Sequence, residues 1–197
     1  FSGTTTLGGA FAFTGNALTF NGALSSTGAM AVANAGTFTT GANGDVIAAG
    51  GLSQTGAGSS RIAGDITTTA SNISFATAVV VTGNVAMGSA NGNINFSGLL
   101  DGDGSATPAN LTLGSGAGNV TFSTKVGSLA TLSTLGINTT GLASATDTIQ
   151  VGSFAINAAS TLPAGSATLL ANVTTATTQV YNTCLLYTSP SPRDAHE

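Results

Sequence analysis

The chain has 197 residues, of which 42% are hydrophobic and only 5% are charged, and its formal net charge is −4 at pH 7. Three Lys and Arg residues cannot neutralise a phosphate backbone, so the composition excludes nucleic-acid binding through a basic patch. With one Cys and one His, the chain also lacks the side chains that metal centres and nucleophile–base pairs need, so we expect no cofactor and no catalysis. No apolar run approaches the ~18 residues of a membrane-spanning helix, so we expect no membrane insertion of this segment.

In chain order, the first predicted elements are short strands. Residues 17–21 (Ala-Leu-Thr-Phe-Asn) and 30–32 (Met-Ala-Val) have the alternation typical of a strand with one buried face. Between them and the next strands, the cluster at 41–45 (Gly-Ala-Asn-Gly-Asp) supplies residues that tolerate positive φ in a tight turn. The chain starts with Phe1 rather than Met, and its first residues already have the pattern of strand and turn. We therefore expect an interior fragment of a longer protein.

A five-residue phrase recurs in the middle of the chain. It consists of Asn, Ile or Val, a small polar residue, Phe and a small residue, and residues 17–21 are a weaker copy. The copies begin at Asn72, Asn93 and Asn119, and their phenylalanines are Phe75, Phe96 and Phe122, spaced by 21 and 26 residues. Each copy has the alternation of a half-buried strand, so the repeat unit contains at least one strand.

Further strands are predicted after the second copy, and no segment predicts a helix. The alternating segments are 111–113 (Leu-Thr-Leu), 135–137 (Leu-Gly-Ile) and 149–151 (Ile-Gln-Val). Apolar residues do not persist at helical spacing, and frequent Gly and β-branched Thr disfavour a helix.

A repeat of about 20–26 residues with two or three short strands predicts one coil of a β-solenoid. We therefore expect an all-β, right-handed parallel β-helix of about seven to eight coils over residues 1–183. Because equivalent positions stack at ~4.8 Å, the asparagines should form a side-chain ladder at one corner and the phenylalanines should stack inside. A β-sandwich is the alternative, but it gives no reason for one phrase to recur in the same register.

The composition changes abruptly after Thr183. Residues 184–194 (CLLYTSPSPRD) match the translation of a transposase-type sequencing adapter at every position, and residues 184–197 contain the only Cys, His and Glu. We therefore expect residues 184–197 to be an artefactual, disordered tail.

An acidic segment in the chain resembles the start of a calcium loop. Asp101 and Asp103 alternate with glycines, but an EF-hand-like loop needs a bidentate Glu at its twelfth position, where this chain has Thr112. We therefore expect a polar loop between two coils, which would explain the 26-residue spacing. Calcium binding by the two aspartates is the alternative.

Paired carboxylates leave an enzymatic hypothesis open. Acidic β-helix enzymes cleave polysaccharides, and two carboxylates suffice for glycoside hydrolysis. Asp45 and Asp65 lie 20 residues apart, about one coil, and Asp101 and Asp103 form a close pair. A cleft that united two of these four would favour the enzyme.

The threonine clusters suggest a third function. They lie at 4–6, 67–69 and 139–140. Ice binding would require Thr-x-Thr pairs aligned on one flat face in successive coils. Otherwise these threonines are strand formers on a solvated face.

The segment GNVTFSTKVGSLATLSTLGINTTG (118–141), preceded by GNINFSGLLDGDGSATPANLTL (92–113), resembles the β-helical repeats of large bacterial exoproteins. These are the filamentous-haemagglutinin-type adhesins and the autotransporter passengers, and the resemblance is clearest over residues 71–140. It implies a secreted or surface-displayed stalk, outside the outer membrane of a Gram-negative bacterium. The implied partners are a host surface glycan or protein, bound through many weak contacts, and flanking coils of the same chain.

Overall fold

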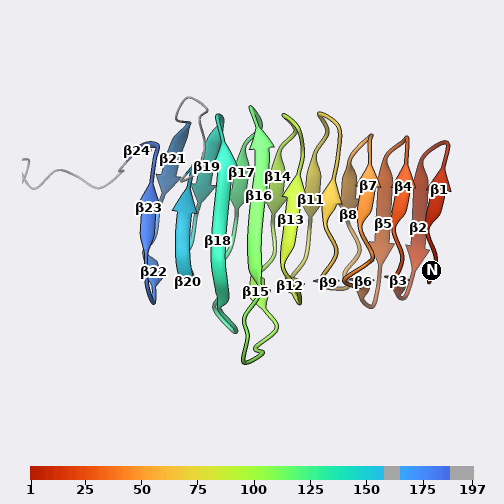
Figure 1. Cartoon of the computed structure of the whole chain (residues 1–197), viewed down its shortest axis with the longest axis horizontal. Coiled ribbons are helices and arrows are strands. Elements are labelled where there is room, and N and C mark those ends of the chain that lie inside the picture. The colour runs from red at the N-terminus through yellow and green to blue at the C-terminus, as the bar shows by residue number, and fades with distance from the viewer. Residues whose placement is uncertain (158–164, 187–197) are drawn as a thin grey trace, which may run out of the picture.

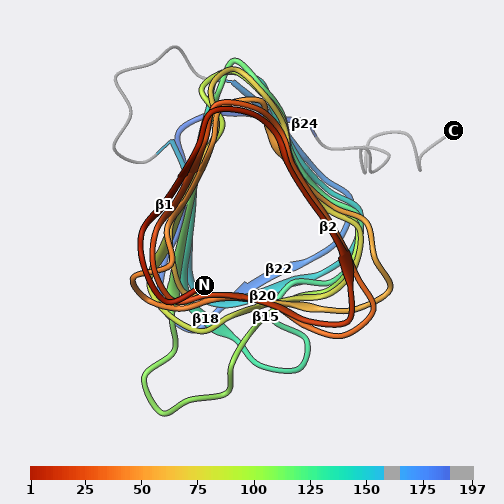
Figure 2. The same ribbon diagram turned by 90° about the vertical axis from the view of Figure 1, so that its right-hand side faces the viewer.

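The computed structural model describes residues 1–157 and 165–186, and its regular elements are all β-strands. The strands stack in about eight turns along one axis (Figure 1), and the cross-section is a triangle with one sheet on each side (Figure 2). Every ladder between these strands is parallel, so the parallel β-solenoid is confirmed and the β-sandwich is wrong. No helix in the described ranges is long and apolar enough to cross a bilayer.

The coil is right-handed, as predicted. Seen from the N-terminal end, the chain runs up the β1 side, crosses the top and descends along β2, so that it turns clockwise as it recedes (Figure 2).

The first face of the triangle contains the longest strands. The order of its strands is β1 (Thr5–Leu7), β4 (Leu24–Ser26), β7 (Val46–Ala48), β10 (Ile66–Thr67), β13 (Val85–Gly88), β16 (Asn110–Gly116), β18 (Leu132–Thr139), β20 (Ile149–Ile156) and β23 (Gln179–Tyr181). β22 (Val173–Thr175) belongs to the same hydrogen-bonded sheet but pairs with the start of β20 and lies on the lower side of the triangle (Figure 2). β18 and β20 have eight residues each, and β20 continues around a corner, because its start pairs with β22 and its end with β23.

The second face carries the repeated phrase. Its order is β2 (Phe11–Gly15), β5 (Met30–Asn34), β8 (Leu52–Gln54), β11 (Ile73–Phe75), β14 (Ile94–Phe96), β17 (Val120–Phe122), β19 (Leu142–Ala145), β21 (Ser166–Leu169) and β24 (Cys184–Leu186). In β11, β14 and β17 the first and third residues are buried and the middle one is half-buried, so the period-2 alternation turns the Ile/Val and the Phe inward.

The third face is a sheet of short strands. Its order is β3 (Leu18–Phe20), β6 (Phe38–Thr40), β9 (Ser60–Ile62), β12 (Val79–Val81) and β15 (Leu100–Gly102). Single bridges from Leu100 to Val126 and from Val126 to Ile149 extend this column to the start of β20. The predicted strands at 30–32, 111–113, 135–137 and 149–151 lie in β5, β16, β18 and β20.

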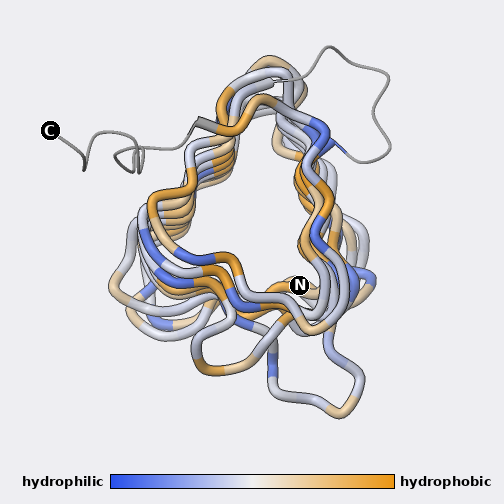
Figure 3. Tube along the Cα trace, turned by 90° about the vertical axis from the view of Figure 1, so that its left-hand side faces the viewer, coloured by the Kyte–Doolittle hydropathy of each residue, from blue (hydrophilic) through white to orange (hydrophobic). Residues whose placement is uncertain are grey.

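The core runs the length of the solenoid. Inward Ile, Val, Leu and Phe side chains are almost fully buried in all three faces. Figure 3 shows these apolar residues recurring along the walls, with hydrophilic residues gathered mainly at the lower corners. One coil could not bury such a face alone, so the stacking of like on like creates the core.

The sequence did not place the weaker copy on a face, and the boundary at Thr183 differs from the prediction. The weaker copy at 17–21 lies in β3, on the third face, so Phe20 packs against Phe1 and Phe38 rather than in the column of the other copies. The coil also passes Thr183, because β24 pairs in parallel with β21. A free sheet edge accepts a strand through its backbone, which explains why the first residues of the expected tail can pair. Residues 187–197 lie outside the described residues.

Candidate functional site

The asparagines of the repeated phrase lie one above another at one corner. The backbone N–H of Asn93 donates to Oδ1 of Asn72 (2.8 Å), and the N–H of Asn119 donates to Oδ1 of Asn93 (2.8 Å). The column continues one coil further, where the N–H of Leu142 donates to Oδ1 of Asn119 (2.9 Å). Each amide side chain therefore satisfies a backbone donor of the next coil.

The phenylalanines of the phrase form one continuous stack inside the second face. The ring centroids of Phe75 and Phe96 are 5.6 Å apart with an interplanar angle of 9°, and those of Phe96 and Phe122 are 5.5 Å apart at 7°. The parallel ladder sets this geometry, because it places each ring directly over its counterpart. Offset stacking adds to the area that the rings bury.

A second ladder, made partly of carboxylates, lies on the first face. The N–H of Asp65 donates to Oδ1 of Asp45 (2.9 Å), and the N–H of Ala86 donates to Oδ1 of Asp65 (2.8 Å). The N–H of Asn110 donates in turn to Oδ1 of Asn84 (3.0 Å). The two aspartates therefore stack in neighbouring coils and serve as backbone acceptors, with the role that the corner asparagines have.

The structure gives Asp101 and Asp103 different surroundings. Asp101 lies in β15, is 4% exposed, and its Oδ1 accepts the N–H of Leu129 (3.0 Å). Asp103 is exposed on the following loop, where its Oδ1 accepts the N–H of Ser105 (3.0 Å). This backbone N–H, together with the Ser105 hydroxyl, holds the pKa of the Asp103 carboxyl below its ordinary value.

These partners leave the calcium hypothesis without a preformed ligand set. The Oδ1 atom of each aspartate already accepts a hydrogen bond from a backbone N–H. In the part of the chain that is described, no three acidic, His or Cys side chains gather where they could hold a metal ion. Calcium binding by Asp101 and Asp103 stays the alternative to a polar loop.

Two neighbouring loops project from the lower side of the triangle (Figure 2), and the second contacts β15, the strand from which the first begins. One comprises residues 103–109, between β15 and β16, and the other residues 123–131, between β17 and β18. The N–H of Gly102 donates to the carbonyl of Ala130 (2.8 Å), and the bond from Leu129 to Asp101 lies beside it. Leu129 is 82% exposed at this protrusion, which we call the paired loops.

Shallow hollows lie beside the paired loops. One of about 460 Å³ is lined by Asp103, Asn84 and Asn110, among others, and one of about 250 Å³ is lined by Asp65 with the same two asparagines. The two hollows therefore adjoin, but neither contains two of the four aspartates considered for catalysis. Their linings are mostly hydroxyl, amide and small side chains.

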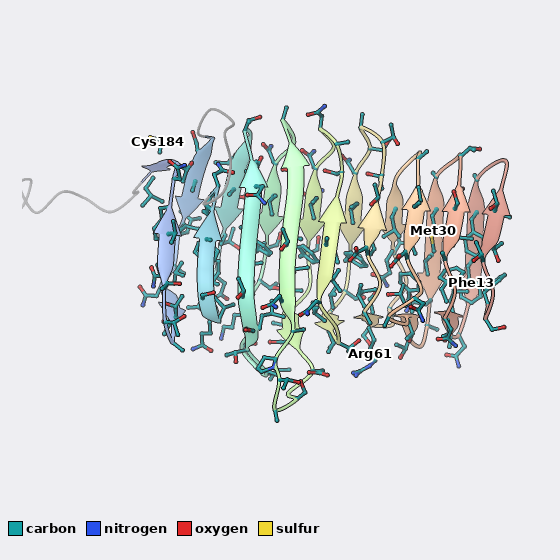
Figure 4. All side chains as sticks on the ribbon, in the orientation of Figure 1. Phe13, Met30, Arg61 and Cys184 are labelled. Carbon is teal, nitrogen blue, oxygen red and sulfur yellow. The ribbon has the colours of Figure 1, made fainter. Side chains whose placement is uncertain are left out.

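The threonine clusters do not come into register in the described coils. Thr6 lies opposite Ser25, and Thr67 lies opposite Ile47, so other residues separate the two threonines in their column. Thr139 is fully buried. The outward column of the third face is equally mixed and consists of Thr19, Thr39, Arg61, Val80 and Asp101. Arg61 projects from this face into solvent (Figure 4). The aligned ranks that ice binding requires are not formed.

Sequence reasoning missed a polar network in the core. Gln54 takes the place of a phenylalanine in the column below Phe75, and it is 1% exposed. Its Nε2 donates to Oδ1 of Asn34 (2.8 Å), and its Oε1 accepts the N–H and the hydroxyl of Thr77 (3.3 and 3.1 Å). The only signal in the sequence was Gln54 itself, and its inward position can be recognised only once the register with Phe75 is known.

No family model matches the chain, and neither a curated protein nor a solved structure matches it.

Proposed function

We propose that this chain is a structural and adhesive stalk segment of a secreted or surface-displayed bacterial repeat protein. The observation that carries the proposal is the combination of an unbroken stack of coils with one protrusion. A stiff rod with smooth polar walls suits a spacer, and among residues 1–157 and 165–186 the paired loops project from these walls. The resemblance of residues 71–140 to bacterial exoprotein repeats supports the same function.

The walls suit a long stack because they are almost free of charge. Equivalent side chains of neighbouring coils lie ~4.8 Å apart, so a charge repeated in every coil would repel its copies. Neutral Ser, Thr and Asn side chains occupy the outward middle position of β8, β11, β14, β17 and β19 instead, as Ser53, Ser74, Asn95, Thr121 and Ser144. Such a surface hydrates well and repeats without repulsion.

Adhesion would come from the paired loops through weak contacts that add when many stalks are displayed together. Leu129 offers an exposed apolar contact, and Asp101 holds its backbone in place. The partner classes that fit are a glycan or a protein on a host surface.

The adhesive function is tested with beads coated at high density with the chain and applied to cultured epithelial cells. The matched variant replaces residues 103–110 by Thr-Gly-Asn, which is the connection that residues 82–84 make one coil earlier, because Gly102 and Leu111 lie opposite Val81 and Val85. We expect coated beads to adhere and the variant beads to lose most of this adhesion, with unchanged far-UV circular dichroism. Thr19→Ala, on the plain wall, is the control. Adhesion no greater than that of uncoated beads would overturn the proposal.

One observation favours a second candidate, a carbohydrate-active enzyme. Asp65 and Asp103 line adjoining hollows that share Asn84 and Asn110, so an extended sugar chain could contact both carboxylates. Release of reducing ends from an acidic polysaccharide, abolished in both Asp65→Asn and Asp103→Asn, would support this function. Absence of release from neutral and acidic polysaccharides would overturn it.

A further inference from the structure

A column of outward polar side chains runs parallel to the solenoid axis beside the loop of residues 103–109. Asn84, Asn110, Thr134 and Ser153 follow one another in successive coils, and each is exposed or half-buried. The N–H of Asn110 donates to Oδ1 of Asn84 (3.0 Å), and the hydroxyl of Ser153 donates to Oγ1 of Thr134 (3.0 Å). The ladder therefore holds neutral amide and hydroxyl groups at the spacing of the coils, ~4.8 Å.

A second column on the same wall includes small residues and leaves a hollow. Asp65, Ala86, Thr112 and Gly136 occupy this column in successive coils. The methyl group of Ala86 is shorter than the side chains of Asp65 and Thr112 on either side of it. A hollow of about 250 Å³ lies there, lined by these three residues and by the two asparagines of the first column. It extends across three successive coils, so its direction is that of the solenoid axis.

The larger hollow beside the paired loops continues the smaller one. It has a volume of about 460 Å³, shares both asparagines, and is bounded on the loop by Asp103, Ser105 and Thr107. This volume lies in the range of ordinary small-molecule sites, ~300–1,000 Å³. We call the two adjoining hollows the axial trough.

The chemistry of the axial trough favours an uncharged ligand that is rich in hydroxyl groups. Among the described residues that line it, none is aromatic or cationic, and its polar side chains are mainly hydroxyls and amides. Asp65 and Asp103 add negative charge, and the backbone N–H of Ser105 lowers the pKa of the Asp103 carboxyl and so keeps it ionised at neutral pH. An anionic ligand would be repelled. Sugar hydroxyls, in contrast, can donate to a carboxylate and accept from an amide.

We propose that the axial trough binds an extended, uncharged oligosaccharide that lies parallel to the solenoid axis. The rise per coil, ~4.8 Å, is close to the length that one sugar ring adds to a cellulose-like chain, so successive rings would meet successive coils. Asp65 and Asn110 lie two coils apart and would contact the two outer rings of a trisaccharide. The inference rests on the proposed adhesive function and names its partner class, a neutral glycan.

The test is an NMR titration of the isotope-labelled full chain with cellohexaose, chitohexaose and xylohexaose, and with hexagalacturonate as the anionic comparison. Asn110→Ala removes an amide that lines both hollows, and Ala86→Leu fills the smaller one. Ala31→Leu is the matched control, because Ala31 is also an exposed alanine within a strand, on the second face. All three variants should retain the far-UV circular dichroism of the wild type.

We expect at least one neutral hexasaccharide to shift the signals of Asn84 and Asn110 saturably. The dissociation constant should be on the order of 0.1–1 mM, because the trough is shallow. Asn110→Ala and Ala86→Leu should each weaken binding about tenfold, and hexagalacturonate should bind at least about tenfold more weakly than the neutral chain. Ala31→Leu should bind like the wild type.

Two results would overturn the inference: no saturable binding of any neutral hexasaccharide at about 10 mM, or binding that both trough variants leave unchanged. The bead experiment separates this inference from the adhesive function. Bead adhesion without hexasaccharide binding would overturn the glycan trough and leave the adhesive function standing. Hexasaccharide binding without bead adhesion would support the trough and overturn the adhesive function.

Discussion

Asn93 shows how a single residue joins three successive coils. Its backbone N–H donates to Asn72 below, and its own Oδ1 accepts the N–H of Asn119 above. A neutral amide can repeat in this way at every coil, whereas a charged group would repel its neighbours. On the first face Asp45 and Asp65 fill the same role, so what the ladder requires is an oxygen acceptor on a short side chain.

Removing that acceptor should lower the free energy of unfolding by the contribution of about one hydrogen bond. We expect Asn93→Ala to lower the free energy of unfolding by about 1 kcal/mol, because the N–H of Asn119 loses its partner. Asn93→Asp keeps the acceptor and should recover most of the loss. Asn95→Ala, on the outward side of the same strand, is the control and should stay within about 0.5 kcal/mol of wild type. Urea unfolding followed by circular dichroism measures all three, and equal effects of Asn93→Ala and Asn95→Ala would contradict the ladder.

The buried amide of Gln54 places a polar group in the middle of the core. Its side chain bonds to Asn34 and to Thr77, and so it links three coils from the inside. In Gln54→Leu the apolar volume is retained, but Oδ1 of Asn34 and the N–H of Thr77 each lose a partner. We therefore expect a loss of about 1–3 kcal/mol in urea unfolding. Ser53→Ala on the same strand should be near neutral, and a Gln54→Leu protein as stable as wild type would show that the network is dispensable.

At the scale of elements, the corners limit how closely the strands can stack. Gly92, Gly118, Gly141 and Gly165 directly precede the ladder position in four successive coils, and each lies against the backbone of the coil below. A Cβ on Gly118 would come within 1.9 Å of the carbonyl oxygen of Gly92. The glycines are needed here because two backbones meet without room for a side chain.

Two glycine substitutions can distinguish the lack of room at the corner from a general effect of replacing glycine by alanine in this fold. Gly118→Ala should destabilise the solenoid by about 1–3 kcal/mol, because the corner must move away from the coil below. In Gly88→Ala, within β13, the new methyl group would have no atom within 4 Å, so this variant should be neutral or slightly stabilising. Thermal unfolding of the two variants beside the wild type tests the difference, which similar melting temperatures would refute.

The elements that could be predicted from the sequence are those in which chemistry recurs at a fixed spacing. Three copies of one phrase sufficed for the parallel register, the phenylalanine stack and the coil length. Corners built from unexpected residues were not predictable: Ala70 and Ala90 adopt positive φ of 51° and 47°, although alanine carries no local signal for it. The face on which the weaker copy at 17–21 lies was not predictable, because alternation alone does not distinguish one side of a triangle from another. The partner of Asp101, Leu129, lies 28 residues away and follows only from the tertiary fold.

For the whole molecule, stability should vary along the axis. Each coil contacts only its neighbours, so a central coil is held from two sides and an end coil from one. The N–H groups of Ile73 and Ile94 bond to the next coil within the continuous phenylalanine stack, whereas those of Thr5 and Cys184 belong to the end coils.

Hydrogen exchange at a concentration that keeps the chain monomeric should therefore show a gradient. Opening an end coil breaks one interface, while opening the centre breaks two and exposes Phe96. We expect the amides of Ile73 and Ile94 to exchange only through global unfolding, and those of Thr5 and Cys184 to exchange fastest, through local fraying. Uniform protection in the dilute sample would instead mean that the coils unfold as one cooperative unit.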